Sequence, residues 1–313
     1  MIIRGTKRAR FRKVALLVAV TFAILTAPTW LRWFGIIGAI PSGMMWGGYE
    51  GIYVNEKSPA EAYPLRTKAG KYMYSPIFTI WRHGVVYWSR PDNAIRVIPA
   101  EGPSKWINMA GRFPAGVDIA DIGNISPAPN GIVLNAGDAS YRVALPAGKV
   151  SLIPDASEAR STEQSEDLVV MNARGNLELR HGSDRRVILR APDTLGSWDY
   201  DFVNGRLCFV DGLQITLTGR DGSSSWRIWP WGLVAPIAVS VVPSTHQVWV
   251  LDAGAFGMGN DLLLYDYHGR LVANRVDAQD ATAGLQMGMV DERTLRTLKR
   301  LDRVAPEEDG VES

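Results

Sequence analysis

The stretch YDFVNGRLCFVDGLQITLTGRDGSSSWRIWP, residues 200–230, decides the fold. It holds four short runs of mainly apolar, β-branched and aromatic residues, and glycine-containing turns such as Asn204-Gly205 and Asp211-Gly212 separate them. A small polar residue before glycine suits a tight hairpin, because glycine adopts positive φ without steric cost. The pattern therefore predicts one four-stranded antiparallel sheet. Its predicted strands cover 200–203, 206–210, 213–217 and 225–229.

Similar units follow one another through most of the chain, which predicts an all-β fold. Their starts are spaced by about 40 residues, the period of four-stranded β-propeller blades. Five units are visible, and residues 49–75 together with those after Gly284 complete a sixth, since a closed ring leaves no sheet edge exposed. We expect a propeller over 49–290 with six blades, five or seven being the alternatives. The units start near Ile77, Ile119, Asp167, Tyr200 and Ile237.

One of these units resembles a known family. Residues 236–243 (PIAVSVVP), 248–254 (VWVLDAG) and 260–266 (NDLLLYD) resemble a blade of the NHL-repeat and gluconolactonase-type propellers. The resemblance covers this blade well, its neighbour loosely and the rest by period. It implies the architecture, and propellers include enzymes, lectins and scaffolds.

The resemblance also implies a metal site. Gluconolactonase-type propellers hold a divalent cation on the central axis with Glu, Asn and Asp side chains, and an irregular set of oxygen ligands suits Ca²⁺. The corresponding early glutamate is not fixed here, because Glu50, Glu56 and Glu61 all qualify. We nevertheless expect no cofactor, because Asp and Asn are common in turns and a turn role explains these residues sufficiently; Ca²⁺ belongs to the hydrolase alternative. The candidate ligands are Asp121, Asn124, Asp199, Asp201 and Asp252.

The N-terminus predicts a membrane anchor. Residues 1–13 are basic without an acidic residue, and residues 14–31 carry no charge, which gives a helix of about 27 Å against a hydrocarbon core of ~30 Å. The positive-inside rule places residues 1–13 in the cytoplasm, so 14–40 form the anchor and its interfacial segment, and 41–48 a tether. The alternative is a cleaved signal peptide, although no small-x-small cleavage site is evident. The expected boundary residues are Arg12, Lys13, Trp30, Arg32 and Trp33.

Charge and cysteine content narrow the functional classes. Beyond residue 40 the chain has 27 basic and 32 acidic residues, a net charge of −5, so nothing points to nucleic acid. The lone Cys208 excludes an intrachain disulfide and lies in an apolar run, as a buried structural residue would.

The C-terminal region departs from the β pattern. Leu295, Leu298 and Leu301 recur three residues apart among basic residues, which predicts an amphipathic helix over 291–304. Such a helix covers the propeller, touches lipid or lies solvated on the surface. Residues 305–313 are acidic and are expected to be disordered.

A tryptophan cluster is the candidate binding surface. Exposed tryptophans stack on sugars or anchor protein partners, whereas buried ones pack between blades. The alternation in 226–229 favours exposure of Trp229 or Trp231. The cluster comprises Trp198, Trp226, Trp229 and Trp231.

The sequence contains no phosphate-binding loop, HExxH motif, paired-cysteine metal spacing or Gly-x-Ser-x-Gly elbow. We therefore expect binding rather than catalysis: a single-pass inner-membrane protein that holds its propeller in the periplasm, or otherwise outside the cytoplasm, and binds or scaffolds an envelope protein complex. The first alternative is a metal-dependent, lactonase-like hydrolase. The second is a glycan or small-ligand binder that uses the Trp-rich blade.

Overall fold

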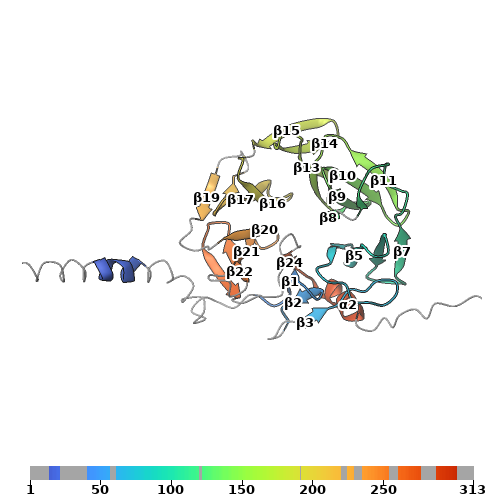
Figure 1. The fold of residues 1–313 in the computed structure, drawn as a ribbon, viewed down its shortest axis with the longest axis horizontal. Coiled ribbons are helices and arrows are strands. Elements are labelled where there is room, and N and C mark those ends of the chain that lie inside the picture. The colour runs from blue at the N-terminus through green and yellow to red at the C-terminus, as the bar shows by residue number, and fades with distance from the viewer. Residues whose placement is uncertain are drawn as a thin grey trace, which may run out of the picture.

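Six four-stranded antiparallel sheets stand in a ring, as seen in Figure 1, which shows a computed structural model of the chain. The first strands face the axis, where most neighbouring pairs contact one another, and the fourth strands form the rim. The all-β, six-bladed propeller is therefore confirmed. The structure describes residues 14–21, 41–56, 61–119, 122–190, 192–219, 224–228, 235–253, 260–275 and 287–301.

Five blades are built from consecutive strands. Blade 2 comprises β4 (Ile77–Trp81), β5 (Gly84–Ser89), β6 (Ala94–Ile98) and β7 (Lys105–Asn108). Blade 3 comprises β8 (Ile122–Ala128), β9 (Gly131–Ala136), β10 (Ala139–Ala144) and β11 (Lys149–Ile153). Blade 4 comprises β12 (Glu158–Thr162), β13 (Ser165–Met171), β14 (Leu177–His181) and β15 (Asp184–Leu189). Blade 5 comprises β16 (Leu195–Asp201), β17 (Arg206–Asp211), β18 (Gln214–Thr218) and β19 (Ser224–Ile228). Blade 6 comprises β20 (Pro236–Val242), β21 (Gln247–Ala253), β22 (Asn260–Asp266) and β23 (Leu271–Arg275).

Blade 1 closes the ring by joining both ends of the propeller sequence. Its first strand is β24 (Met287–Met289), and β1 (Met44–Gly47), β2 (Ile52–Val54) and β3 (Glu61–Tyr63) follow. β24 pairs with β1 in the register Met44↔Met289 and Trp46↔Met287. The expectation that incomplete end units combine is confirmed. Residues 44–47, expected to belong to the tether, instead form a buried strand, because their apolar side chains complete this sheet.

The antiparallel order gives the propeller two distinct faces. Turns between first and second strands, and between third and fourth strands, lie on one face, and the remaining connections lie on the other. We call them the helix face and the tyrosine face, after features described below. The Asn130-Gly131 turn illustrates the predicted glycine chemistry: Gly131 has φ +153°, and a Cβ there would lie 2.0 Å from the Val143 carbonyl oxygen.

The hydrophobic core is divided among the gaps between blades. Among the described residues, six clusters of buried side chains occur, one for each pair of neighbouring blades. Trp46 and Trp249 share the cluster between blades 1 and 6, and Trp88 lies between blades 2 and 3. Period-two alternation supplies side chains to both faces of every sheet, so each blade packs against two neighbours.

The helix α2 (Glu292–Leu301) lies against blades 1 and 2 on the helix face (Figure 1). Leu298 is fully buried with residues of both blades. The Thr297 hydroxyl donates to the His83 carbonyl at 2.9 Å, and Lys299 pairs with Glu56 at 2.9 Å. Of the roles open to the predicted helix, α2 covers the propeller. Residues 305–313 lie outside the described residues.

The predicted anchor is described only in part. Residues 14–21 are helical and exposed. In the part of the chain that the structure describes, no helix is both long and apolar enough to span a membrane. The expected boundary residues, Arg12, Lys13, Trp30, Arg32 and Trp33, lie outside the described residues.

Candidate functional site

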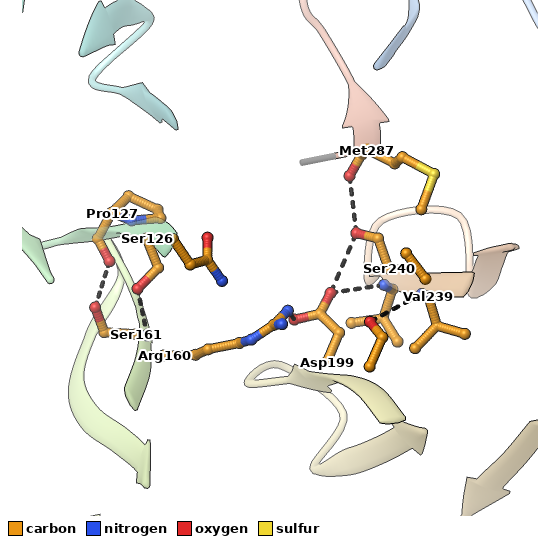
Figure 2. Close-up of a pocket in the computed structure, with 12 residues that line it drawn as sticks. Ser126, Pro127, Arg160, Ser161, Asp199, Val239, Ser240 and Met287 are labelled. Atoms are coloured by element: carbon orange, nitrogen blue, oxygen red, sulfur yellow. Dashed lines mark hydrogen bonds and ion pairs between the residues drawn. The ribbon is translucent and has the colours of Figure 1, made fainter. Parts of the chain in front are cut away.

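A polar cavity of about 240 Å³ lies on the propeller axis. The first strands of five blades line it, namely β8, β12, β16, β20 and β24, and Figure 2 shows their side chains converging from both sides. A second recess of about 410 Å³ shares Ser161, Asp199 and Val241 with it and is lined by turns of blades 4, 5 and 6. The cavity therefore opens on the helix face. Its polar side chains are Asn124, Ser126, Arg160, Ser161, Ser197, Asp199 and Ser240.

Several of these polar side chains accept hydrogen bonds from backbone N–H groups. The first strand of each blade has an unpaired edge facing the axis, whose N–H groups need acceptors. Ser126 accepts a hydrogen bond from the Ser161 N–H at 3.2 Å, and Ser197 accepts one from the Val239 N–H at 3.2 Å. Side chains of one blade thus satisfy the edge strand of the next blade.

Asp199 also accepts a hydrogen bond from the edge strand of the next blade, and its side chain is a charged carboxylate. Its Oδ2 accepts from the Val241 N–H at 2.8 Å and lies 3.1 Å from the Ser240 hydroxyl, and its Oδ1 lies 3.3 Å from Arg160 Nη1. Arg160 also pairs with Glu158 at 3.3 Å. Both charges at the cavity wall are therefore neutralised within the protein (Figure 2).

The charged side chains of the described lining are Arg160 and Asp199, which pair with each other. Among the described lining residues there is no histidine or cysteine beside a serine hydroxyl. His83 lies in the turn after β4 and pairs with Asp291, and His181 ends β14 and pairs with Asp167. Burial raises the pKa of the Cys208 thiol, which keeps the thiol protonated and unreactive.

The structure gathers only part of the predicted metal-ligand set. Asn124 and Asp199 line the cavity. Asp201 is fully buried and accepts from the N–H groups of Val203 and Asn204, and Asp252, also fully buried, accepts from the Ala235 N–H. Both carboxylates therefore accept hydrogen bonds from backbone N–H groups: Asp201 from the turn between β16 and β17, and Asp252, which lies within β21, from the residue before β20. Asp121 lies outside the described residues, and no three His, Cys, Asp or Glu residues within the described part are grouped so that they could hold a metal ion.

The predicted tryptophan surface requires a correction at Trp198. This side chain is only 1 % exposed and packs under Arg160, whose guanidinium carbon lies 4.6 Å from the ring centre. Its Nε1 donates to Glu158 at 3.0 Å. Trp198 thus belongs to the packing between blades 4 and 5. The backbone of Trp226 pairs with Leu217 in β19 and β18, whereas Trp229 and Trp231 lie outside the described residues.

A different aromatic group lies on the tyrosine face. Tyr49, Tyr72 and Tyr74 are 53 %, 54 % and 61 % exposed, and the rings of Tyr49 and Tyr74 stack with centres 4.9 Å apart. Beside them is a groove of about 290 Å³. We call this the tyrosine groove; it is lined by Glu50, Ala62, Pro64, Tyr72 and Tyr74.

The sequence prediction missed this groove because it treated residues 49–75 as irregular. A signal was present in Tyr72-Met73-Tyr74, where two aromatic residues alternate with an aliphatic one. In the structure Met73 points into the core and both tyrosines point out. Alternation of this kind, even outside a clear strand, indicates that two side chains point to one side and the side chain between them to the other.

Comparisons with known proteins support the fold and not a particular family or activity. No family profile matches the sequence, and no curated protein matches it. A chain in the crystal structure of the nidogen/laminin complex superposes with a TM-score of 0.54 at 13 % identity, covering 79 % of this chain and 98 % of that chain. A catalytically inactive virginiamycin B lyase from Staphylococcus aureus, solved with quinupristin, superposes with a TM-score of 0.48 at 15 % identity, covering 81 % and 94 %. The chain is thus a β-propeller protein, and these similarities say nothing more about its activity.

Proposed function

We propose that this protein is a membrane-anchored β-propeller that binds another protein of the cell envelope and acts as a scaffold. The observation that carries this proposal is the tyrosine groove. Exposed tyrosines combine a large apolar area with a hydroxyl group and are enriched in protein interfaces. Three of them gather at one groove, whereas the other exposed apolar side chains of the described blades, such as Leu152 and Leu213, lie on different blades.

The chain topology supports an outward-facing groove. Residue 41 leads into β1 from the helix face, where the Val290 N–H bonds the Gly43 carbonyl at 2.8 Å. β1 then crosses the blade, so Tyr49 lies on the opposite face. If residues 14–40 span the membrane with residues 1–13 in the cytoplasm, the helix face is nearest the bilayer and the tyrosine groove is directed away from it. The basic tail and uncharged stretch support that anchor.

A protein partner also agrees better with the axial cavity than a hydrolase does. The hydrolase alternative needs free oxygen ligands on the axis, yet Asp199 is already bonded to Arg160 and to the Val241 N–H. The similar chain of the nidogen/laminin structure belongs to a complex between proteins, which illustrates one use of this fold.

Affinity purification from gently solubilised native membranes tests partner binding. We expect the full-length protein to recover a stoichiometric partner, and the double variant Tyr72→Ala/Tyr74→Ala to lose it. The control is Leu152→Ala/Leu213→Ala, which removes two exposed apolar side chains from other blades and should retain the partner. Undiminished recovery by the tyrosine variant would overturn the assignment of the surface.

Anchoring is tested separately by extracting membranes with alkaline carbonate. The full chain is expected to stay in the membrane pellet, and a chain lacking residues 1–40 to be released. Protease added to spheroplasts should digest the propeller and spare a tag at the N-terminus. A full chain that carbonate releases would contradict the anchor.

A further inference from the structure

The tyrosine groove is built on a rigid support. Residues 65–73 form a short hairpin in which the Thr67 N–H bonds the Lys71 carbonyl and the Met73 N–H bonds the Leu65 carbonyl, both at 2.9 Å. Leu65 and Met73 are buried in the cluster between blades 1 and 2. The loop that carries Tyr72 is therefore fixed to the core.

Each ring is also held in place by a neighbour. The guanidinium carbon of Arg66 lies 4.3 Å from the centre of the Tyr72 ring, and Arg66 Nη1 donates to the Gly70 carbonyl at 3.0 Å. Tyr74 stacks on Tyr49, and the Ser75 N–H bonds the Tyr49 carbonyl at 2.8 Å. Rings that are ordered before binding lose little conformational freedom when a ligand arrives, so their contact area contributes more fully to affinity.

The lining identifies the chemistry of the ligand. Two tyrosines, Pro64 and Ala62 provide an apolar, aromatic groove, and Glu50 is the one charged residue among the described residues that line it. Glu50 is an exposed residue, and its Oε2 accepts a hydrogen bond from the Tyr53 hydroxyl at 3.2 Å. Arg66 donates to the Gly70 carbonyl and the Tyr72 hydroxyl and is not among the residues that line the groove. The groove therefore favours an apolar ligand that carries a positive charge.

We propose that the tyrosine groove binds a proline-rich segment of a protein partner in the polyproline II conformation, with a basic residue of that segment beside Glu50. Aromatic-lined grooves recognise such segments because the polyproline II helix is largely formed before binding. A lysine or arginine next to the prolines would pair with Glu50 and stack on a tyrosine ring. This inference rests on the proposed function and specifies its partner.

Fluorescence anisotropy with the full-length protein in detergent micelles tests the proposal. The probe is a labelled decaproline peptide with two flanking arginines, compared with the same peptide flanked by glutamates and with one in which serine replaces every proline. We expect the arginine-flanked peptide to bind, the glutamate-flanked peptide to bind at least about tenfold more weakly, and the serine peptide not to bind. Tyr72→Ala/Tyr74→Ala should abolish binding, whereas Leu152→Ala/Leu213→Ala should leave it unchanged.

The Glu50→Gln variant distinguishes the contribution of the Glu50 charge to peptide binding from that of the shape of the groove. It should reduce the preference for arginine over glutamate flanks while retaining the requirement for proline. If no proline peptide binds but membrane purification still shows a partner that depends on Tyr72 and Tyr74, the ligand class is wrong and the proposed function stands. If the partner is also independent of these tyrosines, the proposed function itself fails. Tyrosine-dependent binding of an envelope oligosaccharide without any binding of the proline peptides would overturn the inference in favour of a glycan.

Discussion

The Tyr267 phenol donates a hydrogen bond of 2.5 Å to the Asp201 carboxylate, joining blade 6 to the end of the first strand of blade 5. Asp201 also accepts from Asn204 Nδ2 at 2.7 Å, in addition to the two backbone N–H groups already described. The carboxylate is fully buried, so its four donors replace the water that it loses on folding. This pair couples two blades at the helix face.

Tyr267→Phe is expected to destabilise the propeller by about 2 kcal/mol, because it removes one of the donors to a buried charge. The urea midpoint of the full-length protein in detergent, followed by tryptophan fluorescence, measures the change. Phe retains the ring that packs against His246 and Arg206, so a loss of stability reports on the hydroxyl group. A variant as stable as the wild type would show that the bond contributes nothing net.

The same tyrosine predicts a dependence on alkaline pH. Burial, reinforced by the hydrogen bond from Tyr267 to Asp201, raises the pKa of Tyr267 well above its usual range. Below about pH 10 the tyrosine is protonated in both the folded and the unfolded chain, and its contribution is complete. Above about pH 10 the unfolded chain loses the proton while the folded protein retains it, so stability falls as pH rises. Urea midpoints measured from about pH 8 to about pH 11 should decline less steeply for Tyr267→Phe than for the wild type.

Asp199→Ala tests the wall of the axial cavity. It removes the acceptor of the Val241 N–H and the partner of Arg160, and we expect a loss of about 2 kcal/mol. Asp199→Asn keeps one carbonyl oxygen as an acceptor and should cost less. Urea unfolding of the two variants gives the comparison. Equal stability of Asp199→Ala and the wild type would show that water replaces the carboxylate without cost.

Strands with a clear apolar pattern were predictable, and those with a mixed pattern were not. The second strand of blade 5 was expected over 206–210 and observed as Arg206–Asp211, because alternation and flanking glycine turns fix it locally. The start of blade 4 was expected near Asp167, yet β12 begins at Glu158. Its sequence EARST is mostly polar, and Arg160 and Ser161 of this strand line the axial cavity. This strand is stabilised by pairing with β13 and by packing against blade 3, and neither contact is visible in the local sequence.

The roles of candidate site residues depended on contacts between blades, which the sequence does not encode locally. Asp199 serves the backbone of β20, about 40 residues along the chain, and Trp198 is covered by Arg160 of the preceding blade. The resemblance to gluconolactonase-type propellers gave Asn124 and Asp199 as axial candidates, and both line the cavity. The sequence did not show whether such a carboxylate accepts hydrogen bonds from the backbone, as Asp199 does, or is available to a ligand.

Asp291→Ala is expected to weaken the start of α2. Asp291 Oδ1 accepts from the Thr294 N–H at 2.7 Å, the geometry of a helix N-cap, and its loss should cost about 1 kcal/mol. Burial alone would raise the pKa of Asp291, but the hydrogen bonds from Thr294 and the proximity of His83 outweigh it, and the net pKa is lowered. The capping contribution is therefore present above the pKa of the unfolded chain, about 3.9, and is lost as pH falls through the lower folded value. Thermal unfolding at neutral and acidic pH should show the difference between Asp291→Ala and the wild type shrinking in acid.

The final prediction concerns how α2 stabilises the closed ring. Leu298 is fully buried with Ile52 of blade 1 and Val85 of blade 2, so Leu298→Ala leaves a cavity at the junction between them and should cost about 3 kcal/mol. The surface contacts of the helix contribute far less: Arg293 and Glu101 lie 2.6 Å apart, but both are more than half exposed, and such pairs contribute at most about 1 kcal/mol. Arg296→Ala, at an exposed position of the same helix, is the matched control and should leave the urea midpoint unchanged. Hydrogen exchange locates the effect, because loss of the Leu298 side chain should speed exchange in β2 and β5 before other strands. If exchange rises equally in all blades, α2 supports the whole ring cooperatively rather than the junction of blades 1 and 2.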